Sequence, residues 1–90
     1  MPVTVKIPTQ LRAATGGDAV AEVAGGTVRE VLDELYARYE ELGERISQDG
    51  GLRRFVNVYV DGEDIRFLEG LDTRVGEGDE ITILPAVAGG

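Results

Sequence analysis

A single long amphipathic helix is the feature that most restricts the fold of this chain. Apolar residues recur at helical spacing along one stretch, at Val28, Val31, Leu32, Leu35, Tyr36, Tyr39 and Leu42. Thr27 and Glu30 stand three residues apart at the start of this stretch, which is the spacing of a capping box. The apolar stripe of a helix has to be buried against another layer. With strands as the only other regular elements, the pattern predicts a two-layer α+β fold.

The two tyrosines of the stripe allow two interpretations. Tyr36 and Tyr39 could stack on a ligand as a pair of rings, or they could fill the core and its rim. Because both lie on the apolar side of the helix, we interpret them as packing residues.

Segments of alternating apolar and polar residues predict strands on both sides of the helix. The predicted strands run from Val3 to Ile7, Ala19 to Val23, Phe55 to Val60 and Ile81 to Pro85, with Glu63 to Arg66 as a brief additional strand. The first two form an antiparallel hairpin with a long, irregular connection. Asp61-Gly62 is predicted as a two-residue hairpin turn.

The remaining segments are predicted to be irregular. Residues Gly43 to Leu52 form a loop with a short helical turn at 44–47. Residues Phe67 to Val75 have no regular pattern, and we expect Leu68 and Leu71 to hold this segment against the core.

The order of these elements favours one small fold. The first and last strands are expected side by side in the centre of a mixed sheet of four to five strands, with the helix crossing one face. That arrangement is a β-grasp. We expect a single β-grasp domain over residues 1–85 and a free, flexible C-terminal tail over residues 86–90.

The composition excludes most enzyme chemistry. The chain of 90 residues has no His and no Cys, which removes Ser/His and Cys/His catalysis and most transition-metal sites. The acidic clusters at 61–64 and 77–80 lack the spacing of a calcium loop, and Asp61 and Asp79 stand where turns favour Asp. The paired glycines lack the context of phosphate-binding loops. We therefore expect no catalytic residue, no metal and no bound cofactor.

The charge and hydropathy of the chain restrict its partners and its location. A net charge of −8 argues against nucleic acid as a partner, because phosphates require a basic surface. The sequence has no long apolar run and no basic-then-apolar leader. We therefore expect neither a membrane span nor a secretory signal. Together with the lack of cysteine, this favours a cytoplasmic protein that is monomeric when free.

The last five residues, Ala86, Val87, Ala88, Gly89 and Gly90, have almost no side chains. A frayed terminus would explain such a composition, since chain ends tolerate small residues. The alternative is that the C-terminal carboxylate is the functional group. A carboxylate that is threaded into the channel of an adenylating enzyme needs a thin backbone around it, and glycine allows the closest approach. Pro85 would stiffen the start of this segment.

The chain is similar to the ubiquitin-like sulfur-carrier family, over its whole length in strand order and most specifically in its last fourteen residues. The residues that show the resemblance are the stretch from Glu77 to Ile81, the ending from Ile83 to Gly90 and the Val56-Asn57 pair. The family includes the small subunit of molybdopterin synthase and the sulfur carrier of thiamine synthesis. The segments 55–60 and 82–90 most resemble actinobacterial carriers that supply sulfur for cysteine synthesis.

The resemblance implies a two-step cycle. An E1-like enzyme uses ATP to adenylate the carboxylate of Gly90, and a sulfur donor then displaces AMP to leave a thiocarboxylate. Ala86, Val87, Ala88 and Gly89 would be the residues that the partner recognises. In the cysteine-forming relatives a PLP-dependent synthase accepts the sulfur, and a metal-dependent peptidase releases cysteine. In the molybdopterin pathway the acceptor is the large subunit of the synthase. ATP, PLP and metal belong to these partners, so none is expected to bind here.

Two other functions remain open from the sequence. The same diglycine could conjugate the protein to lysines of other proteins, or the domain could be a binding module with an incidental tail. Lys6 is the only lysine, so chains built in the manner of ubiquitin are not expected. Because fold alone does not separate these functions, the tail decides in favour of the sulfur carrier.

One face of the sheet is predicted to contact the activating enzyme. In the last strand, Ile81 and Ile83 should face the helix, which turns Leu84 to the opposite, open face. Phe55 and Tyr59 fall on the same open face if the valines between them face inward. We expect Leu84, Phe55 and Tyr59 to form the docking face, although mutual covering of the two aromatic rings across the sheet is the alternative.

Overall fold

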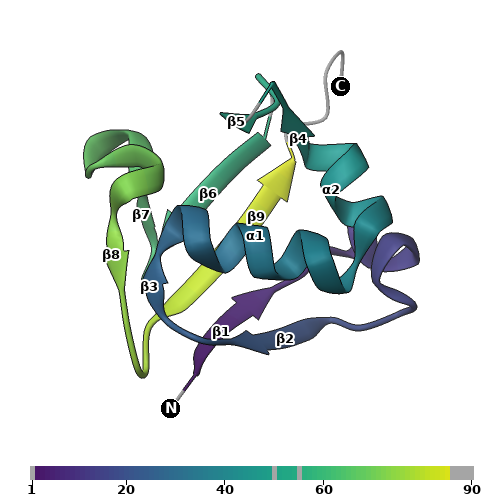
Figure 1. Cartoon of the computed structure of the whole chain (residues 1–90), viewed down its shortest axis with the longest axis horizontal. Helices are drawn as coiled ribbons and strands as arrows, with labels where there is room; N and C mark the ends of the chain where they lie inside the picture. Colours follow the sequence, from purple (N-terminus) through teal and green to yellow (C-terminus); the bar gives the residue numbers. More distant parts are fainter. Residues whose placement is uncertain (1, 50, 55, 86–90) are drawn as a thin grey trace.

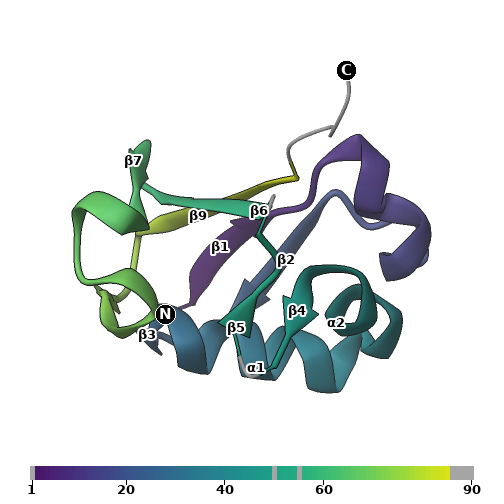
Figure 2. The ribbon, with the colours of Figure 1, turned by 90° about the horizontal axis from the view of Figure 1, so that it is seen from above.

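The protein has two layers, a mixed sheet and a layer of helices (Figures 1 and 2). The computed structural model describes residues 2–49, 51–54 and 56–85. The main sheet consists of β1 (Val3–Lys6), β2 (Val20–Val23), β6 (Val56–Val60), β7 (Glu63–Asp64) and β9 (Glu80–Pro85). Two short pairs join β3 (Gly26–Thr27) to β8 (Arg74–Val75) and β4 (Ser47–Gln48) to β5 (Gly51–Leu52). The helices are α1 (Val28–Arg38), α2 (Glu40–Ile46) and the 3₁₀ segments η1 (Thr9–Thr15), η2 (Ile65–Phe67) and η3 (Gly70–Asp72).

The order of the strands in the main sheet is β2-β1-β9-β6-β7. The central pair, β1 and β9, is parallel, with Val5 opposite Ile81. All other neighbours in this sheet are antiparallel. The predicted mixed sheet, with the first and last strands adjacent in its centre, is therefore confirmed.

Strand alternation builds the core between the sheet and α1. Nine apolar residues of β2, β1, β9 and β6 face the helix and are buried: Val3, Val5, Ala21, Val23, Val56, Val58, Val60, Ile81 and Ile83. Helix α1 contributes its apolar stripe, Val28, Val31, Leu32 and Leu35, to the same cluster. In Figure 2 both α1 and α2 lie on this one side of the sheet. The opposite face of the sheet is left open.

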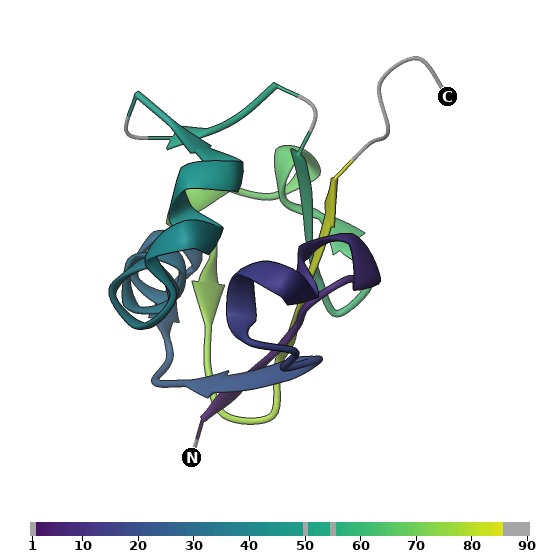
Figure 3. The same cartoon turned by 90° about the vertical axis from the view of Figure 1, so that its right-hand side faces the viewer.

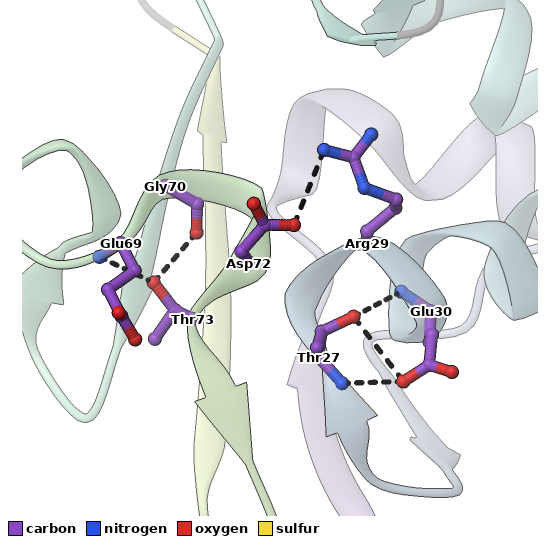
Figure 4. A network of polar contacts seen from close by, with 7 residues as sticks. All are labelled: Thr27, Arg29, Glu30, Glu69, Gly70, Asp72 and Thr73. Atoms are coloured by element: carbon purple, nitrogen blue, oxygen red, sulfur yellow. Dashed lines mark hydrogen bonds and ion pairs between the residues drawn. The ribbon is translucent and has the colours of Figure 1, made fainter.

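The predicted capping box starts α1, and Figure 4 shows it (Thr27 and Glu30). The backbone N–H of Glu30 donates to Thr27 Oγ1 over 3.2 Å, and the N–H of Thr27 donates to Glu30 Oε1 over 2.9 Å. Arg29 forms an ion pair with Asp72 of η3 at 3.6 Å, which links the first turn of the helix to the β7–β8 connection. The cap satisfies two N–H groups that the helix itself leaves unpaired.

The predicted apolar stripe is divided between two helices. Helix α1 ends at Arg38, and Tyr39 takes the non-helical angles φ −131° and ψ 86° before α2 begins at Glu40. Tyr39 also donates from its hydroxyl to Asp18 Oδ2 over 2.8 Å. Tyr36 and Tyr39 are partly buried against the core, as predicted. The change of direction at Tyr39 brings α2 against η1.

The predicted helical turn at 44–47 is confirmed through Ile46 as the end of α2, whereas the predicted loop is wrong at Gly43 and lacks the β4–β5 pair. Helix α2 continues to Ile46, whose side chain is fully buried, and β4 and β5 then pair across Ser47 and Leu52. Gly43 is a packing residue, because a Cβ there would lie 3.1 Å from the ring of Tyr36. A glycine that normally indicates a loop is used here to bring two helices together.

The predicted irregular connection between the first two strands contains η1. Leu11 and Ala14 of this helical segment are buried, so it covers one end of the core. It ends at Gly16, which has a left-handed φ of 68°. Short 3₁₀ segments have no long apolar period, and the sequence pattern therefore did not indicate it.

The hairpin turn at Asp61-Gly62 is confirmed, with φ angles of 51° and 87°. The return strand was predicted to reach Arg66, but β7 is shorter, because only Glu63–Asp64 pairs with β6. Asp64 Oδ1 accepts a hydrogen bond from the N–H of Arg66 over 2.8 Å. This local bond competes with the strand ladder and starts η2 instead.

The prediction for the β7–β8 connection is half correct. Leu71 packs against the core, but Leu68 is 37% exposed and does not. The segment is fixed by Thr73, whose hydroxyl donates to the carbonyl of Gly70 over 2.7 Å and accepts from the N–H of Glu69 over 3.0 Å (Figure 4). A buried polar side chain here performs the role that the sequence analysis assigned to a leucine.

Candidate functional site

The central strand β9 is the last strand before the predicted tail. It is paired on both sides, with β1 and β6 (Figure 3). Its last residue, Pro85, lies opposite Val56 at the start of β6. Each of its inward residues, Ile81 and Ile83, has no exposed surface. A strand held in this way fixes the point and the direction in which the chain leaves the domain.

The predicted tail residues lie outside the described residues. They are Ala86, Val87, Ala88, Gly89 and Gly90, and the roles assigned to them stay predictions. The same is true of Phe55, the first residue of the predicted middle strand.

The predicted composition of the open face is confirmed for the two residues that can be placed. Leu84 pairs with Asn57, and Thr82 pairs with Tyr59. Residues that are directly opposite on neighbouring strands share one face, so these four side chains lie together on the side away from α1. Leu84 is 44% exposed and is one of the few large apolar side chains at the surface of the described residues. Its role in docking stays a prediction.

A charged network that the sequence analysis missed lies beside Leu84. The guanidinium of Arg66 donates to Asp64 Oδ2 over 2.8 Å and to Asn57 Oδ1 over 2.8 Å. Asp64 is only 8% exposed, and these hydrogen bonds from Arg66 lower the pKa of its carboxyl group. The only sequence signal was the Asp-x-Arg spacing after the hairpin turn, which does not by itself predict the contact with Asn57 across the sheet.

The two acidic clusters hold turns, as predicted. Asp61 Oδ1 accepts from the N–H of Glu80 over 2.9 Å, and Asp79 Oδ2 accepts from the N–H of Gly76 over 2.8 Å. Glu80 also forms an ion pair with Lys6 at 3.4 Å. Across residues 2–49, 51–54 and 56–85 no group of three or more His, Cys, Asp or Glu side chains could hold a metal ion. In the same ranges no helix has the length and apolar character to cross a membrane.

Comparison with known proteins identifies the family. Residues 5–90 match the ThiS family, and the match includes the diglycine. The chain belongs to the ThiS family. It is 50% identical over 93 residues to the sulfur carrier protein CysO of Mycobacterium tuberculosis, with both chains covered completely. This ThiS-family protein is thus a sulfur carrier, and carriers of this kind act as protein-bound sulfur donors.

Solved structures agree with the fold. A chain in the crystal structure of the Amycolatopsis orientalis BexX/CysO complex is 50% identical, with a TM-score of 0.90 and coverage of 98% of this chain and 99% of that one. The solution structure of the small archaeal modifier protein 1 from Methanosarcina acetivorans is 36% identical, with a TM-score of 0.88 and coverage of 99% and 96%. The ThiS-family chain therefore has the ubiquitin-like β-grasp fold that its strand order predicts.

Proposed function

We propose that the carboxylate of Gly90 is the sulfur-carrying group of this protein. An E1-like enzyme transfers AMP from ATP to one carboxylate oxygen and releases pyrophosphate, which converts an inert carboxylate into an acyl adenylate. A sulfur donor then attacks the acyl carbon, AMP leaves, and a thiocarboxylate remains. The observation that carries the proposal is the family match through residue 90. The carrier supplies no catalytic residue and binds no cofactor, since ATP belongs to the enzyme.

The position of β9 is consistent with such a cycle. Five residues follow Pro85 in the sequence, and a fully extended segment of that length spans at most about 17 Å. The active site of the activating enzyme therefore has to lie within that distance of the end of β9. Part of the surface of the enzyme would then cover the neighbouring open face, where Leu84 and Tyr59 lie.

Cysteine synthesis is the pathway that we propose for the sulfur. The support is the 50% identity to the CysO carrier over the full length of both chains. The acceptor would be a PLP-dependent cysteine synthase, followed by a metal-dependent peptidase that releases cysteine. The large subunit of molybdopterin synthase is the alternative acceptor. We further propose that the protein acts in the cytoplasm, is monomeric when free and binds no nucleic acid.

Protein modification is a second candidate function. It is favoured by the likeness to the archaeal modifier protein from Methanosarcina acetivorans. Modification and sulfur transfer start from the same activated Gly90, but they differ in the nucleophile that attacks its acyl carbon. In modification the nucleophile is a lysine amine, and in sulfur transfer it is the sulfur of a sulfur donor. Lysates incubated with tagged carrier would contain isopeptide conjugates only if modification occurs.

Intact mass spectrometry tests the first step. The purified carrier, incubated with its E1-like enzyme, ATP and sulfide, should gain the mass that corresponds to one oxygen replaced by sulfur. Deletion of Gly90 should abolish this gain without changing the stability of the domain. Gly90→Ala should slow it by about tenfold or more, because a methyl group at the reacting residue obstructs close approach. An unchanged mass of the wild type, under conditions that convert a known carrier, would contradict the proposal.

A further inference from the structure

A hollow with a cationic rim lies along the outer edge of β6, next to the open face. Its volume is about 280 Å³. Strand β7 pairs only with Tyr59 and Val60 of β6, so the first half of this edge is not covered by a neighbouring strand. The lining combines apolar side chains with three arginines and one acidic residue, and it includes Leu52, Val56, Leu71, Arg53, Arg54, Arg66 and Asp64. An apolar hollow with several cations at its rim is an unusual feature in a chain of net charge −8.

Arg66 is held in a fixed orientation at this rim. Its guanidinium contacts Asp64 at 2.8 Å and Asn57 at 2.8 Å, while 68% of its side chain stays exposed. The carboxyl group of Asp64 is nearly buried, and it therefore acts as a rigid anchor. An arginine whose orientation is already fixed loses less conformational entropy when it binds a further acceptor. The network thus presents unused N–H donors to a partner at low entropic cost.

The other two arginines contribute charge that is not neutralised within the described part of the chain. Arg53 donates to a neutral acceptor, the backbone carbonyl of Glu44, over 3.0 Å. Arg54 is exposed and makes neither a hydrogen bond nor an ion pair with any residue that the structure describes. Asp49 lines a neighbouring hollow together with Arg54, but no ion pair joins them. Three of the chain's 9 basic residues are therefore gathered at one hollow.

The hollow lies directly beside the point where the chain leaves the sheet. Val56 lines it and is also the residue opposite Pro85. Neighbouring strands are about 4.8 Å apart, so a protein that receives the C-terminal segment beyond Pro85 passes within reach of the hollow. The opposite end of β9 is acidic, with Asp61 and Asp79 next to Glu80. The charges near the two ends of β9 thus differ in sign, and only the end near Pro85 attracts carboxylates.

We propose that this hollow binds a segment of the activating enzyme in which an apolar side chain is flanked by Asp or Glu residues. The apolar side chain fills the space beside Val56, and the carboxylates contact Arg66, Arg53 and Arg54. This inference rests on the proposed function, because it names a second contact of the same enzyme. The hollow orients the enzyme on the domain, and complementary charges accelerate the encounter. A free inorganic anion would use the arginines but leave the apolar lining uncovered.

The test compares arginines at the hollow with arginines elsewhere. The variants are Arg66→Gln and the double variant Arg53→Gln/Arg54→Gln. The matched controls are Arg45→Gln on α2, which loses an exposed ion pair to Glu41, and the double variant Arg45→Gln/Arg74→Gln. Titration of the E1-like enzyme with each carrier, without ATP, gives Kd. Circular dichroism and thermal unfolding of each variant establish that it is folded.

We expect Kd to rise about tenfold for Arg66→Gln and for the double variant at the hollow, and less than about twofold for the controls. Added sodium chloride should weaken the binding of wild type more than that of the double variant, since charge attraction is screened. Sodium phosphate at matched ionic strength should weaken wild type no more than chloride does. Equal Kd values for hollow and control variants, or no measurable binding of wild type, would overturn the proposal. A specific effect of phosphate would also overturn it, in favour of a site for free anions.

The mass assay separates this inference from the proposed function. If wild type and all folded variants acquire sulfur while hollow and control variants bind alike, the hollow has no role and the sulfur carrier stands. If the hollow variants weaken binding but wild type acquires no sulfur, the docking surface stands and the proposed chemistry is wrong.

Discussion

The two faces of the central sheet show how one strand can serve stability and recognition separately. Ile83 of β9 faces α1 and has no exposed surface, whereas Leu84, the next residue, faces outward and is 44% exposed. The covered face is apolar across β2, β1, β9 and β6. The open face carries polar and charged residues that bond to one another, among them Lys6 with Glu80 and Arg66 with Asn57.

Alternation along a strand assigns stability and recognition to neighbouring residues. Successive side chains of a strand point to opposite faces, so a change on one face leaves the packing of the other largely intact. The electrostatic environment of the two layers differs as well. Burial in the helical layer raises the pKa of Tyr36, while the hydrogen bonds from Arg66 on the open face lower the pKa of Asp64.

The largest effect on stability is expected from Ile83→Ala. The substitution removes apolar atoms from a fully buried position, and the free energy of unfolding should fall by about 2–5 kcal/mol. Urea unfolding measures this loss. Leu84→Ala, an equivalent truncation on the open face, is the matched control and should cost less than about 1 kcal/mol, because Leu84 is already exposed. Equal losses for the two variants would show that both faces contribute to stability.

An intermediate effect, on binding rather than stability, is expected from Leu84→Asp. The domain should remain folded, while the affinity for the activating enzyme falls by about 1–3 kcal/mol, the range of an ordinary to strong interface residue. Val20→Asp is the control, because Val20 is 49% exposed and lies on the same face at the far edge of the sheet. A titration in which both variants bind like wild type would mean that Leu84 does not contact the enzyme.

The smallest effect concerns Tyr36 in the helical layer. Burial, and secondarily the charge of Asp33, raise the pKa of Tyr36 from 10.0 to about 12. Because the folded state favours the neutral phenol, its contribution to stability is complete below pH 10.0 and is lost as the pH rises toward about 12. Tyr36→Phe should remove this alkaline loss in the free energy of unfolding, which is on the order of 1 kcal/mol after allowance for partial exposure of the ring.

Urea unfolding of wild type and Tyr36→Phe at neutral and at alkaline pH provides the measurement. The difference in stability between the two proteins should change in favour of the variant only on the alkaline side. A constant difference across the whole range would indicate that the ring is solvated, and that the helical layer is less protected than its packing suggests.

Local patterns were sufficient to predict several elements. The capping box of Thr27 and Glu30, the hairpin turn at Asp61-Gly62 and the alternation of β9 each depend on residues a few positions apart. The face assigned to Leu84 follows from the same alternation. The role of Gly90 was inferred from the residue types at the end of the chain and from the family resemblance, and it stays a prediction; the family match extends over residues 5–90.

Other features depend on contacts between distant segments, and local patterns indicated the wrong structure. Gly43 reads as a loop residue, but it lies inside α2, where a Cβ would come 3.1 Å from the ring of Tyr36 and the ring would have to shift. Leu68 reads as a core residue, but Thr73 closes the segment with hydrogen bonds and leaves Leu68 at the surface. In both cases packing or a buried polar bond overrides the preference of a single residue type.

The sequence by itself determined the order of the strands and their inner and outer faces, because these follow from periods of two and 3.6 residues. Only the tertiary structure decided where α1 gives way to α2 and how the arginines assemble. Arg66 and Asn57 are nine positions apart, and Arg53 lies on another segment. Their common position at the edge of β6 results from strand register and from the fold of the β7–β8 connection, which no local pattern specifies.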